Sequence, residues 1–157
     1  MNTDFDFQIG TWDVAHRQLH KVFAGCTDWS EFRSTSVVHG FFEGAGSFEE
    51  HTFHSRGTRG AAVRVYDPSA ERWAIYWVSS VDGQMQPPVY GRFTDGVGIF
   101  EGDDEYAGRP IKVRFVWSEI KDESARWHQE FSEDGGETWE INWIMDFARV
   151  GAKPSQP

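Results

Sequence analysis

RWHQEFSEDGGETWEINWIMDFAR, residues 126–149, consists of two segments of alternating apolar and polar residues joined by a short glycine-rich run. Successive side chains of a β-strand point to opposite faces, so each segment predicts a strand with one buried face. The side chains predicted to share that face are Trp127, Gln129, Phe131, Trp139, Ile141, Trp143, Met145 and Phe147. The connecting run SEDGGETWE, 132–140, predicts a tight hairpin, because Gly135 and Gly136 can adopt positive φ and Asp134 can accept hydrogen bonds from turn amides.

The run SEDGGETWE resembles the Asp-box, a turn found in carbohydrate-active β-propellers. Here it stands between two strands that share one buried face, so the chain must reverse tightly, and Ser132 and Asp134 can stabilise that reversal through hydrogen bonds. The run holds too few ordered carboxylates for a calcium site. We therefore interpret it as a structural hairpin rather than as a site for sugar or calcium.

Eight other segments show the same two-residue period, and no window of a dozen residues has apolar positions at helical spacing. They lie near residues 9–21, 31–42, 46–54, 61–66, 72–79, 89–93, 97–102 and 111–119. An Asp-Pro pair at 67–68 and an Asp-Gly pair at 95–96 are typical turn sequences between them. The pattern predicts an all-β domain over 1–149, a single antiparallel up-and-down β-barrel of about ten strands, followed by a flexible tail at 150–157.

The 157-residue chain has the length of one ordinary domain. Its formal net charge of −10 argues against nucleic-acid binding, which requires clustered Lys and Arg. No apolar run approaches the roughly 20 residues that span a bilayer, so we expect no membrane-spanning segment. The single cysteine, Cys26, cannot form an internal disulfide, and the chain does not open with a secretion signal, so we expect a cytoplasmic protein.

The stretch FDFQIGTWDV, residues 5–14, contains a Gly-Thr-Trp triplet that resembles the G-x-W signature of lipocalin-type barrels. In such a position Gly10 lets the chain pass close to the barrel floor and Trp12 plugs that end. Over nearly its whole length the chain resembles a family of small bacterial lipocalin-like proteins of unknown function, similar to the calycin barrels and more distantly to nitrobindin. The motifs that carry this resemblance are the triplet, RVYDP at 64–68, RFVWSEI at 114–120 and the run 126–149. The resemblance implies the barrel fold and no particular chemistry.

Several polar residues fall at positions predicted to face the barrel interior. If Trp12 faces inward, alternation carries Val14, His16, Gln18 and His20 inward as well, and His39 and Glu50 alternate with apolar neighbours. Buried polar groups cost free energy unless they are paired, so they predict either a ligand cavity or a filled core in which His and Glu pair with each other. The predicted cavity lining is Trp12, His16, His39, Glu50, Trp77, Tyr90, Arg92, Trp117, Trp127, Gln129 and Trp143. Predicted core-facing side chains in two further segments are Ala61, Val63, Val65, Trp73, Ile75 and Trp77.

Three functions are compatible with this barrel. The leading hypothesis is binding of a small, largely hydrophobic or aromatic ligand in a Trp-lined cavity. The alternative is an enzyme of the same fold, of cyclase or isomerase type, in which His16 or His39 acts as general base or acid and Glu50 orients it. The second alternative is heme binding. A homodimer formed through exposed strand edges is compatible with all three.

The sequence predicts no metal site and no resident cofactor. On a strand, His16 and His20 lie about 13 Å apart, too far to share one ion, and no zinc-type spacing occurs among the six histidines. The nitrobindin-like resemblance implies a heme-binding histidine on a late strand, where His128 stands. His128 alternates with Trp127 and Gln129, however, so we expect it to point to solvent. Cys26 lies in no catalytic signature.

Overall fold

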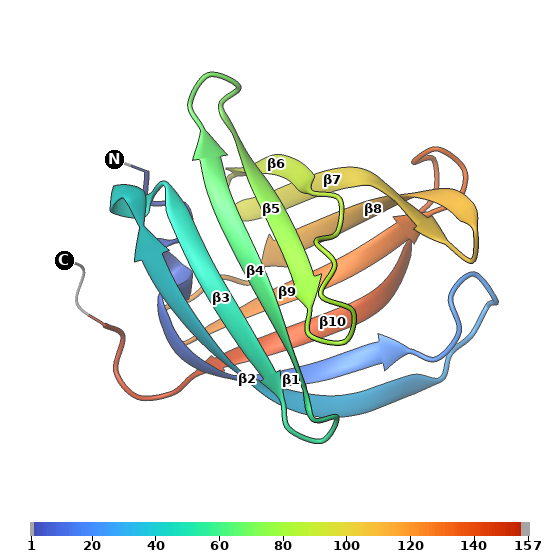
Figure 1. Ribbon diagram of the computed structural model, residues 1–157, viewed down its shortest axis with the longest axis horizontal. Coiled ribbons are helices and arrows are strands. Elements are labelled where there is room, and N and C mark those ends of the chain that lie inside the picture. The colour runs from blue at the N-terminus through green and yellow to red at the C-terminus, as the bar shows by residue number, and fades with distance from the viewer. Residues whose placement is uncertain (1, 155–157) are drawn as a thin grey trace.

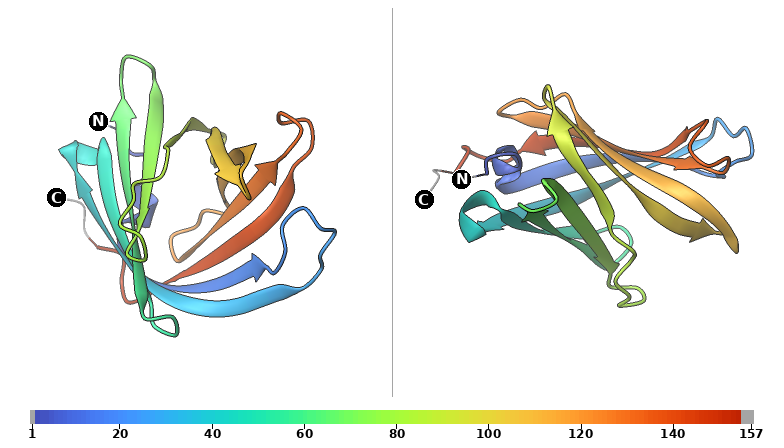
Figure 2. Two further views of the ribbon diagram at one scale, coloured as in Figure 1. Left: turned by 45° about the vertical axis from the view of Figure 1, so that its right-hand side comes forward. Right: turned by 90° about the horizontal axis from the view of Figure 1, so that it is seen from above.

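The computed structural model, which describes residues 2–154, is a closed antiparallel barrel in which each of ten strands pairs with the next and the last pairs with the first (Figure 1). The strands are β1 Gly10–Leu19, β2 Trp29–Phe41, β3 Gly46–Phe53, β4 Thr58–Asp67, β5 Arg72–Ser79, β6 Val89–Thr94, β7 Val97–Tyr106, β8 Arg109–Ser118, β9 Ser124–Ser132 and β10 Glu140–Arg149. The all-β, lipocalin-like barrel expected from the two-residue period is therefore confirmed. Figure 2 shows how the sheet curves until β1 lies beside β10.

Outside the strands, the described residues form turns, loops and two short 3₁₀ helices, η1 Asp6–Gln8 and η2 Phe42–Gly44. Among the described residues, no helix is long and apolar enough to cross a membrane. The expected tail begins where β10 ends, and residues 150–154 continue without strand structure. Its last part, 155–157, lies outside the described residues.

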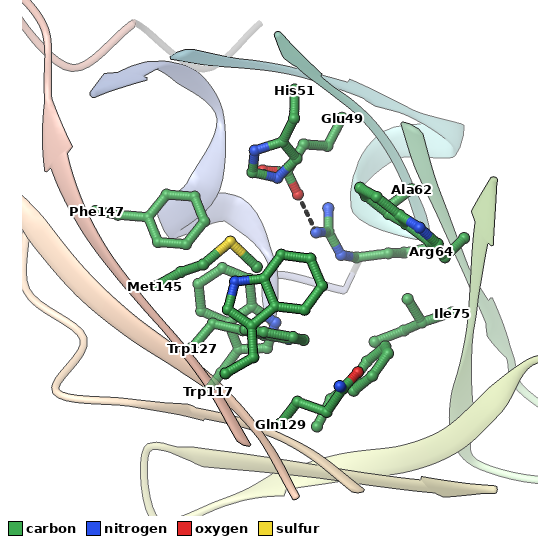
Figure 3. A pocket seen from close by; sticks show the side chains of 13 residues that line it. Glu49, His51, Ala62, Arg64, Ile75, Trp117, Trp127, Gln129, Met145 and Phe147 are labelled. Carbon is green, nitrogen blue, oxygen red and sulfur yellow. Dashed lines mark hydrogen bonds and ion pairs between the residues drawn. The ribbon is translucent and has the colours of Figure 1, made fainter. Parts of the chain in front are cut away.

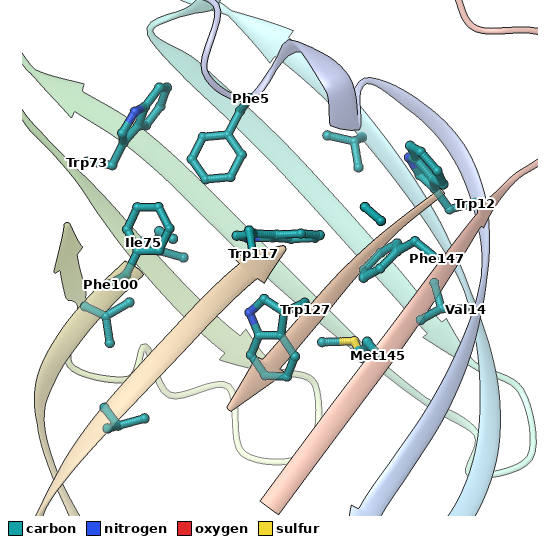
Figure 4. Close-up of a cluster of buried hydrophobic side chains, with 14 residues drawn as sticks. Phe5, Trp12, Val14, Trp73, Ile75, Phe100, Trp117, Trp127, Met145 and Phe147 are labelled. Carbon is teal, nitrogen blue, oxygen red and sulfur yellow. The ribbon is translucent and has the colours of Figure 1, made fainter. Parts of the chain in front are cut away.

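One end of the barrel is closed by the N-terminal segment that precedes β1. The Phe5 ring is buried and packs edge-on against Trp73, at a centroid distance of 4.8 Å (Figure 4). It also packs edge-on against Phe93, at 5.0 Å. The Trp73 indole Nε1 donates a hydrogen bond to Asp4 Oδ2 at 2.9 Å, which fixes the segment to β5. Aromatic side chains that bury their rings in this way stabilise the closed end of the barrel.

Gly10 and Trp12 lie at this closed end, as the Gly-Thr-Trp triplet predicted. Gly10 has φ +126°, and a Cβ there would come within 2.7 Å of Arg149 Nη1, so a larger residue would clash with that guanidinium. The Arg149 guanidinium lies 4.2 Å from the centroid of the fully buried Trp12 ring. It donates hydrogen bonds to the carbonyls of Phe7 at 2.6 Å and Ile9 at 2.7 Å. One side chain from the last strand thus joins the first strand to the closing segment, a role that the sequence did not reveal.

The barrel opens at the other end, beside the weakest strand pairing. β5 and β6 pair only from Trp73 to Ile75, after which the strands diverge and residues 80–88 connect them, with one isolated bridge between Val78 and Met85. Trp77 lies in this divergent part of β5. A Cβ on Gly60 of β4 would come within 2.2 Å of the Trp77 ring, so glycine at that position leaves room for the indole.

The turn SEDGGETWE is a hairpin between β9 and β10, as predicted. Gly135 and Gly136 have φ of +77° and +97°. Asp134 Oδ1 accepts hydrogen bonds from Ser132 Oγ at 2.8 Å and from the Thr138 amide at 2.9 Å. These hydrogen bonds, first those from Thr138 and then that from Ser132, lower the pKa of Asp134 to about 2. Ser132, Asp134 and Thr138 of the Asp-box therefore form hydrogen bonds with one another, within the turn.

The inward and outward faces of β2 and β3 are opposite to the prediction. Phe48 is 38% exposed whereas the next residue, Glu49, is 1% exposed. The predictions that His39 and Glu50 face the interior are therefore wrong, and both side chains lie on the outer surface. The reason is that Val37, which pairs with Glu50 across the sheet, is an outer residue, while the interior of this half of the barrel is polar.

The same reversal affects β4 and β6. On β4 the inward residues are Ala62 and Arg64, both buried, so the prediction that the alternate set Ala61, Val63 and Val65 faces the core is wrong. On β6, Tyr90 and Arg92 are exposed on the outer face, and the prediction that they line the mouth is wrong as well. The Arg72 guanidinium of the neighbouring strand lies over the Tyr90 ring instead, with its central carbon 3.9 Å from the ring centroid.

Strict alternation also fails near the ends of β1 and β10. The β9–β10 register shifts between Ile141 and Trp143, and this irregularity leaves Asn142 buried and Ile141 exposed. Trp139, predicted to share the inner face, packs instead on the outer side against Arg114, at 3.8 Å. At the end of β1, Leu19 is buried and His20 is exposed, so the prediction of an inward His20 is wrong.

Candidate functional site

A cavity extends from the interior of the barrel to its open end, between β3–β5 and β8–β10 (Figure 3). Its volume is about 70 Å³. This is room for several water molecules, since one water needs about 10–15 Å³ of such space. A larger molecule would therefore place only one end in the cavity, and the rest would extend towards the open end.

Strands β8, β9 and β10 form an aromatic wall. Its members, all inward on their strands, are Phe115, Trp117, Trp127, Trp143, Met145 and Phe147. The Trp127 ring packs edge-on against Trp143 at 5.6 Å and against Phe115 at 5.0 Å. Trp77 and Ile75 of β5 complete the apolar lining. Edge-on aromatic pairs stabilise each other beyond the area that they bury, so these contacts stabilise the wall.

Strands β3 and β4 form a polar wall opposite, made of Glu49, His51 and Arg64 (Figure 3). All three side chains are at least 96% buried. Glu49 Oε2 accepts hydrogen bonds from His51 Nε2 at 2.9 Å and from Ser36 Oγ at 2.6 Å. Glu49 Oε1 accepts from Gln8 Nε2 at 2.9 Å and from Arg64 Nη2. Because an ionised carboxylate offers about four acceptor positions, Glu49 is saturated by its neighbours.

The ionisation of Glu49 follows from these contacts. Burial alone would raise the pKa of Glu49, but the neighbouring His51 and Arg64, together with hydrogen bonds from His51 and Ser36, lower it below its usual range. Glu49 is therefore a carboxylate at neutral pH, and its charge is compensated by Arg64. A buried charge of this kind is stable only while its partner is present.

Behind the cavity, a chain of hydrogen bonds connects the aromatic wall to the polar wall. Trp143 Nε1 donates to His16 Nδ1 at 3.0 Å, and His16 Nε2 lies 2.8 Å from Ser34 Oγ. Ser34 Oγ lies in turn 3.3 Å from His51 Nδ1. An indole N–H can only donate, so His16 must accept at Nδ1 and carry its proton on Nε2. Ser34 can then donate to His51, and the tautomer of His51 with its proton on Nε2 fits both of its contacts.

His16 is uncharged in this chain. Burial, followed by the nearby His51 and by Arg56 and Arg33, lowers the pKa of His16 to about 3. A protonated imidazole would also have to donate from Nδ1, where the Trp143 N–H already points. His16 therefore serves as a fixed link between the two walls.

The sequence of hydrogen bonds from Ser34 through His51 to Glu49 resembles that of a catalytic triad, but the position of Ser34 does not suit nucleophilic attack. Ser34 is buried and does not line the cavity. Both ring nitrogens of His51 are engaged, one by Ser34 and one by Glu49, so neither is free to take a proton from a bound molecule. The arrangement therefore offers no free nitrogen of His51 for acid-base chemistry in the cavity.

The structure brings together only part of the predicted site. Trp77, Trp117, Trp127, Gln129 and Trp143 line the cavity. Trp12 and His16 are buried but do not line it: the first belongs to the closed end, and the second lies in the chain of hydrogen bonds. His39, Glu50, Tyr90 and Arg92 lie outside the barrel.

Sequence reasoning missed Glu49, His51 and Arg64. A signal for them was present in SFEEHTF, 47–53, where Phe53 shares their face, but Phe48 marks the opposite face equally well. The predicted pairing of a histidine with a glutamate inside the barrel does occur, between His51 and Glu49 instead of the expected residues.

Two other expectations concerned histidine ligands. His128 lies on the outer face of β9, as its alternation predicted, but it is only partly exposed, with Nε2 2.8 Å from Glu130 Oε1. It is therefore separated from the cavity by the sheet. Among residues 2–154, no group of three or more His, Cys, Asp or Glu side chains is placed to hold a metal ion.

Comparisons with protein-family models and with curated proteins found no significant match to this sequence. The class of protein is therefore defined by the structure itself, as a closed ten-stranded antiparallel barrel consistent with a lipocalin- or calycin-like fold. In barrels of this type the interior is the usual place for one small ligand.

Proposed function

We propose that this barrel binds a small, largely hydrophobic or aromatic molecule in the cavity between its aromatic and polar walls. The observation that carries the proposal is the convergence of four tryptophans from β5, β8, β9 and β10 on one cavity, namely Trp77, Trp117, Trp127 and Trp143. Pockets that bind small molecules are mostly lined by apolar and aromatic side chains, with a few polar groups that fix orientation.

The size of the cavity limits how such a molecule binds. The cavity volume, about 70 Å³, is smaller than the roughly 150 Å³ of a cavity that holds benzene. In the proposed binding mode the ligand therefore inserts only one end between the two walls, and its apolar body extends towards the open end of the barrel.

Isothermal titration calorimetry with a panel of small aromatic compounds tests this proposal. We expect at least one compound to bind the wild-type protein and to bind Trp127→Leu about ten-fold more weakly, because removal of an anchoring aromatic side chain typically costs more than 1 kcal/mol. Trp139→Leu is the matched control, since Trp139 lies on the outer face of the sheet, against Arg114. The proposal is wrong if no compound binds, or if both substitutions weaken binding equally.

A further inference from the structure

Most polar atoms of the polar wall already have a hydrogen-bond partner, but one does not. Three buried polar atoms in residues 2–154 have no hydrogen-bond partner, namely Gln8 Oε1, Arg64 Nε and Asn142 Nδ2. Of these, only Arg64 Nε belongs to a side chain that lines the cavity. Its guanidinium extends from β4 towards Glu49 (Figure 3), and its other nitrogens already bind Glu49 and, at 3.3 Å, Ser47 Oγ. A buried unsatisfied N–H is unfavourable, so the Arg64 side chain keeps one donor in the barrel interior that would gain from an acceptor.

From this arrangement we infer that the cavity selects a neutral ligand whose buried end is a hydrogen-bond acceptor, such as the carbonyl oxygen of an aromatic ketone, aldehyde or amide, and that Arg64 is the residue that receives it. The inference rests on the proposed function and adds the chemical class of the ligand.

A cationic or donor group is a poor match for this wall. Among the described residues that line the cavity, Glu49 is the only carboxylate, and its two oxygens already accept hydrogen bonds from Gln8, Ser36, His51 and Arg64. A donor placed against Glu49 would have to displace one of these groups and leave it unpaired in the interior. Displacement of that kind cancels the gain from the new contact.

An anionic group is a poor match for a different reason. Glu49 and Arg64 compensate each other, and His16 is held uncharged behind them. A ligand carboxylate would add a second negative charge beside Glu49 in a medium of low dielectric constant, without a second cation to balance it. A ligand without any polar group would avoid this cost but would leave Arg64 Nε unpaired.

The decisive experiment is a calorimetric titration of the wild-type protein with four compounds of similar size: acetophenone, ethylbenzene, benzoate and benzylammonium. We expect acetophenone to bind about ten-fold more tightly than each of the other three, the factor of a net hydrogen bond to a charged donor. The inference is overturned if any of the other three binds as tightly as acetophenone. If none of the four binds while other aromatic compounds do, the inference falls and the proposed function stands; if no aromatic compound binds, both fall.

Arg64→Lys assigns the donor, because lysine keeps a positive charge beside Glu49 but lacks the planar guanidinium with its spare N–H. In this variant the preference for acetophenone over ethylbenzene should fall close to one. Arg114→Lys, on the outer face of β8 beside Glu101 and Glu130, is the control and should keep the preference. A folded Arg64→Lys protein that keeps the ten-fold preference overturns the assignment to Arg64. If Arg64→Lys does not fold, the ligand series with the wild-type protein decides the chemical class by itself.

Discussion

The two walls of the cavity are stabilised in different ways. The aromatic wall of β8–β10 consists of side chains that gain free energy from area and from edge-on contacts, such as Trp127 against Trp143. The polar wall of β3 and β4 consists of groups that are stable only because each has a specific partner, above all Glu49 and Arg64. A change of shape in the first wall should therefore be tolerated better than a change of charge in the second.

This difference also separates two roles within one site. An apolar wall attracts many molecules of suitable size, whereas a wall of paired charges rejects most polar groups and accepts few. Affinity in this cavity should come mainly from the tryptophans, and selectivity from the polar groups opposite them. The hydrogen bonds from Trp143 through His16 and Ser34 to His51 connect the two walls, so the geometry of one depends on the other.

The largest effect is expected from removing the charge of Glu49. Glu49→Gln keeps the shape of the side chain but leaves the buried Arg64 guanidinium without a counter-charge, and breaking a buried pair typically costs about 3–5 kcal/mol of unfolding free energy. Urea denaturation measures this loss. Glu50→Gln is the matched control, because Glu50 is exposed and its partner Arg59 lies 3.5 Å away at the surface, where such pairs contribute about 0–1 kcal/mol. Equal losses of unfolding free energy in Glu49→Gln and Glu50→Gln would contradict the view that the buried ion pair contributes more to stability than the surface pair.

A smaller effect is expected from the pH dependence that His16 confers. The pKa of His16 falls from an ordinary value of 6.5 to about 3 in the folded protein. Below pH 6.5 the unfolded chain therefore binds a proton at His16 that the native state does not bind, and the free energy of unfolding decreases as the pH falls towards 3. The slope from one such group is at most about 1.4 kcal/mol per pH unit.

Urea denaturation at pH 7.0, 6.0 and 5.0 measures this slope. His16→Gln should reduce it, because an amide can accept from Trp143 and donate to Ser34 without titrating. His39→Gln, on the exposed outer face, should leave the slope unchanged. Glu49 contributes in the same direction at lower pH, since the pKa of Glu49 is also below its usual range: its stabilisation is present above about pH 4.5 and is lost as the pH falls further. If the slope for His16→Gln equals that of the wild-type protein, the hydrogen bonds of His16 do not keep it unprotonated in the folded state.

Much of the fold was predictable because it depends on local signals. All ten strands follow from the two-residue period, and the hairpin at 132–140 follows from its glycines and Asp134. On β8 and β9, bulky aromatics occupy one face only, so the inward positions of Trp117 and Trp127 were also predictable. Local pattern is sufficient where one face of a strand is clearly more apolar than the other.

The polar wall was not predictable, because this local signal is missing there. In β3, Phe48 lies on one face and Phe53 on the other, so apolar content does not decide which face is buried. A shift of one residue exchanges the two faces completely, and the sequence of an isolated strand contains no information about its neighbours. The true assignment depends on cross-strand contacts, such as those between Ser36, Glu49 and Arg64, which appear only once β2, β3 and β4 are side by side.

The smallest effect is expected on the outer face, from Trp139. Its indole Nε1 donates to the Gly136 carbonyl at 3.0 Å, and its ring packs 3.8 Å from the Arg114 guanidinium. Trp139→Leu should lower the free energy of unfolding by about 1–2 kcal/mol, the sum of one hydrogen bond and one surface cation-π contact. Thermal denaturation at fixed pH measures this loss.

Trp139 and Trp127 are of the same residue type, lie in neighbouring strands or their connecting turn, and differ in the face of the sheet that they occupy. A loss of stability in Trp139→Leu without any change in ligand affinity would show that the outer tryptophan stabilises the turn between β9 and β10 and nothing else. A loss of affinity in Trp139→Leu as large as that in Trp127→Leu would contradict this separation of the two faces, and with it the proposed binding site, because a tryptophan outside the cavity would then matter as much as one that lines it.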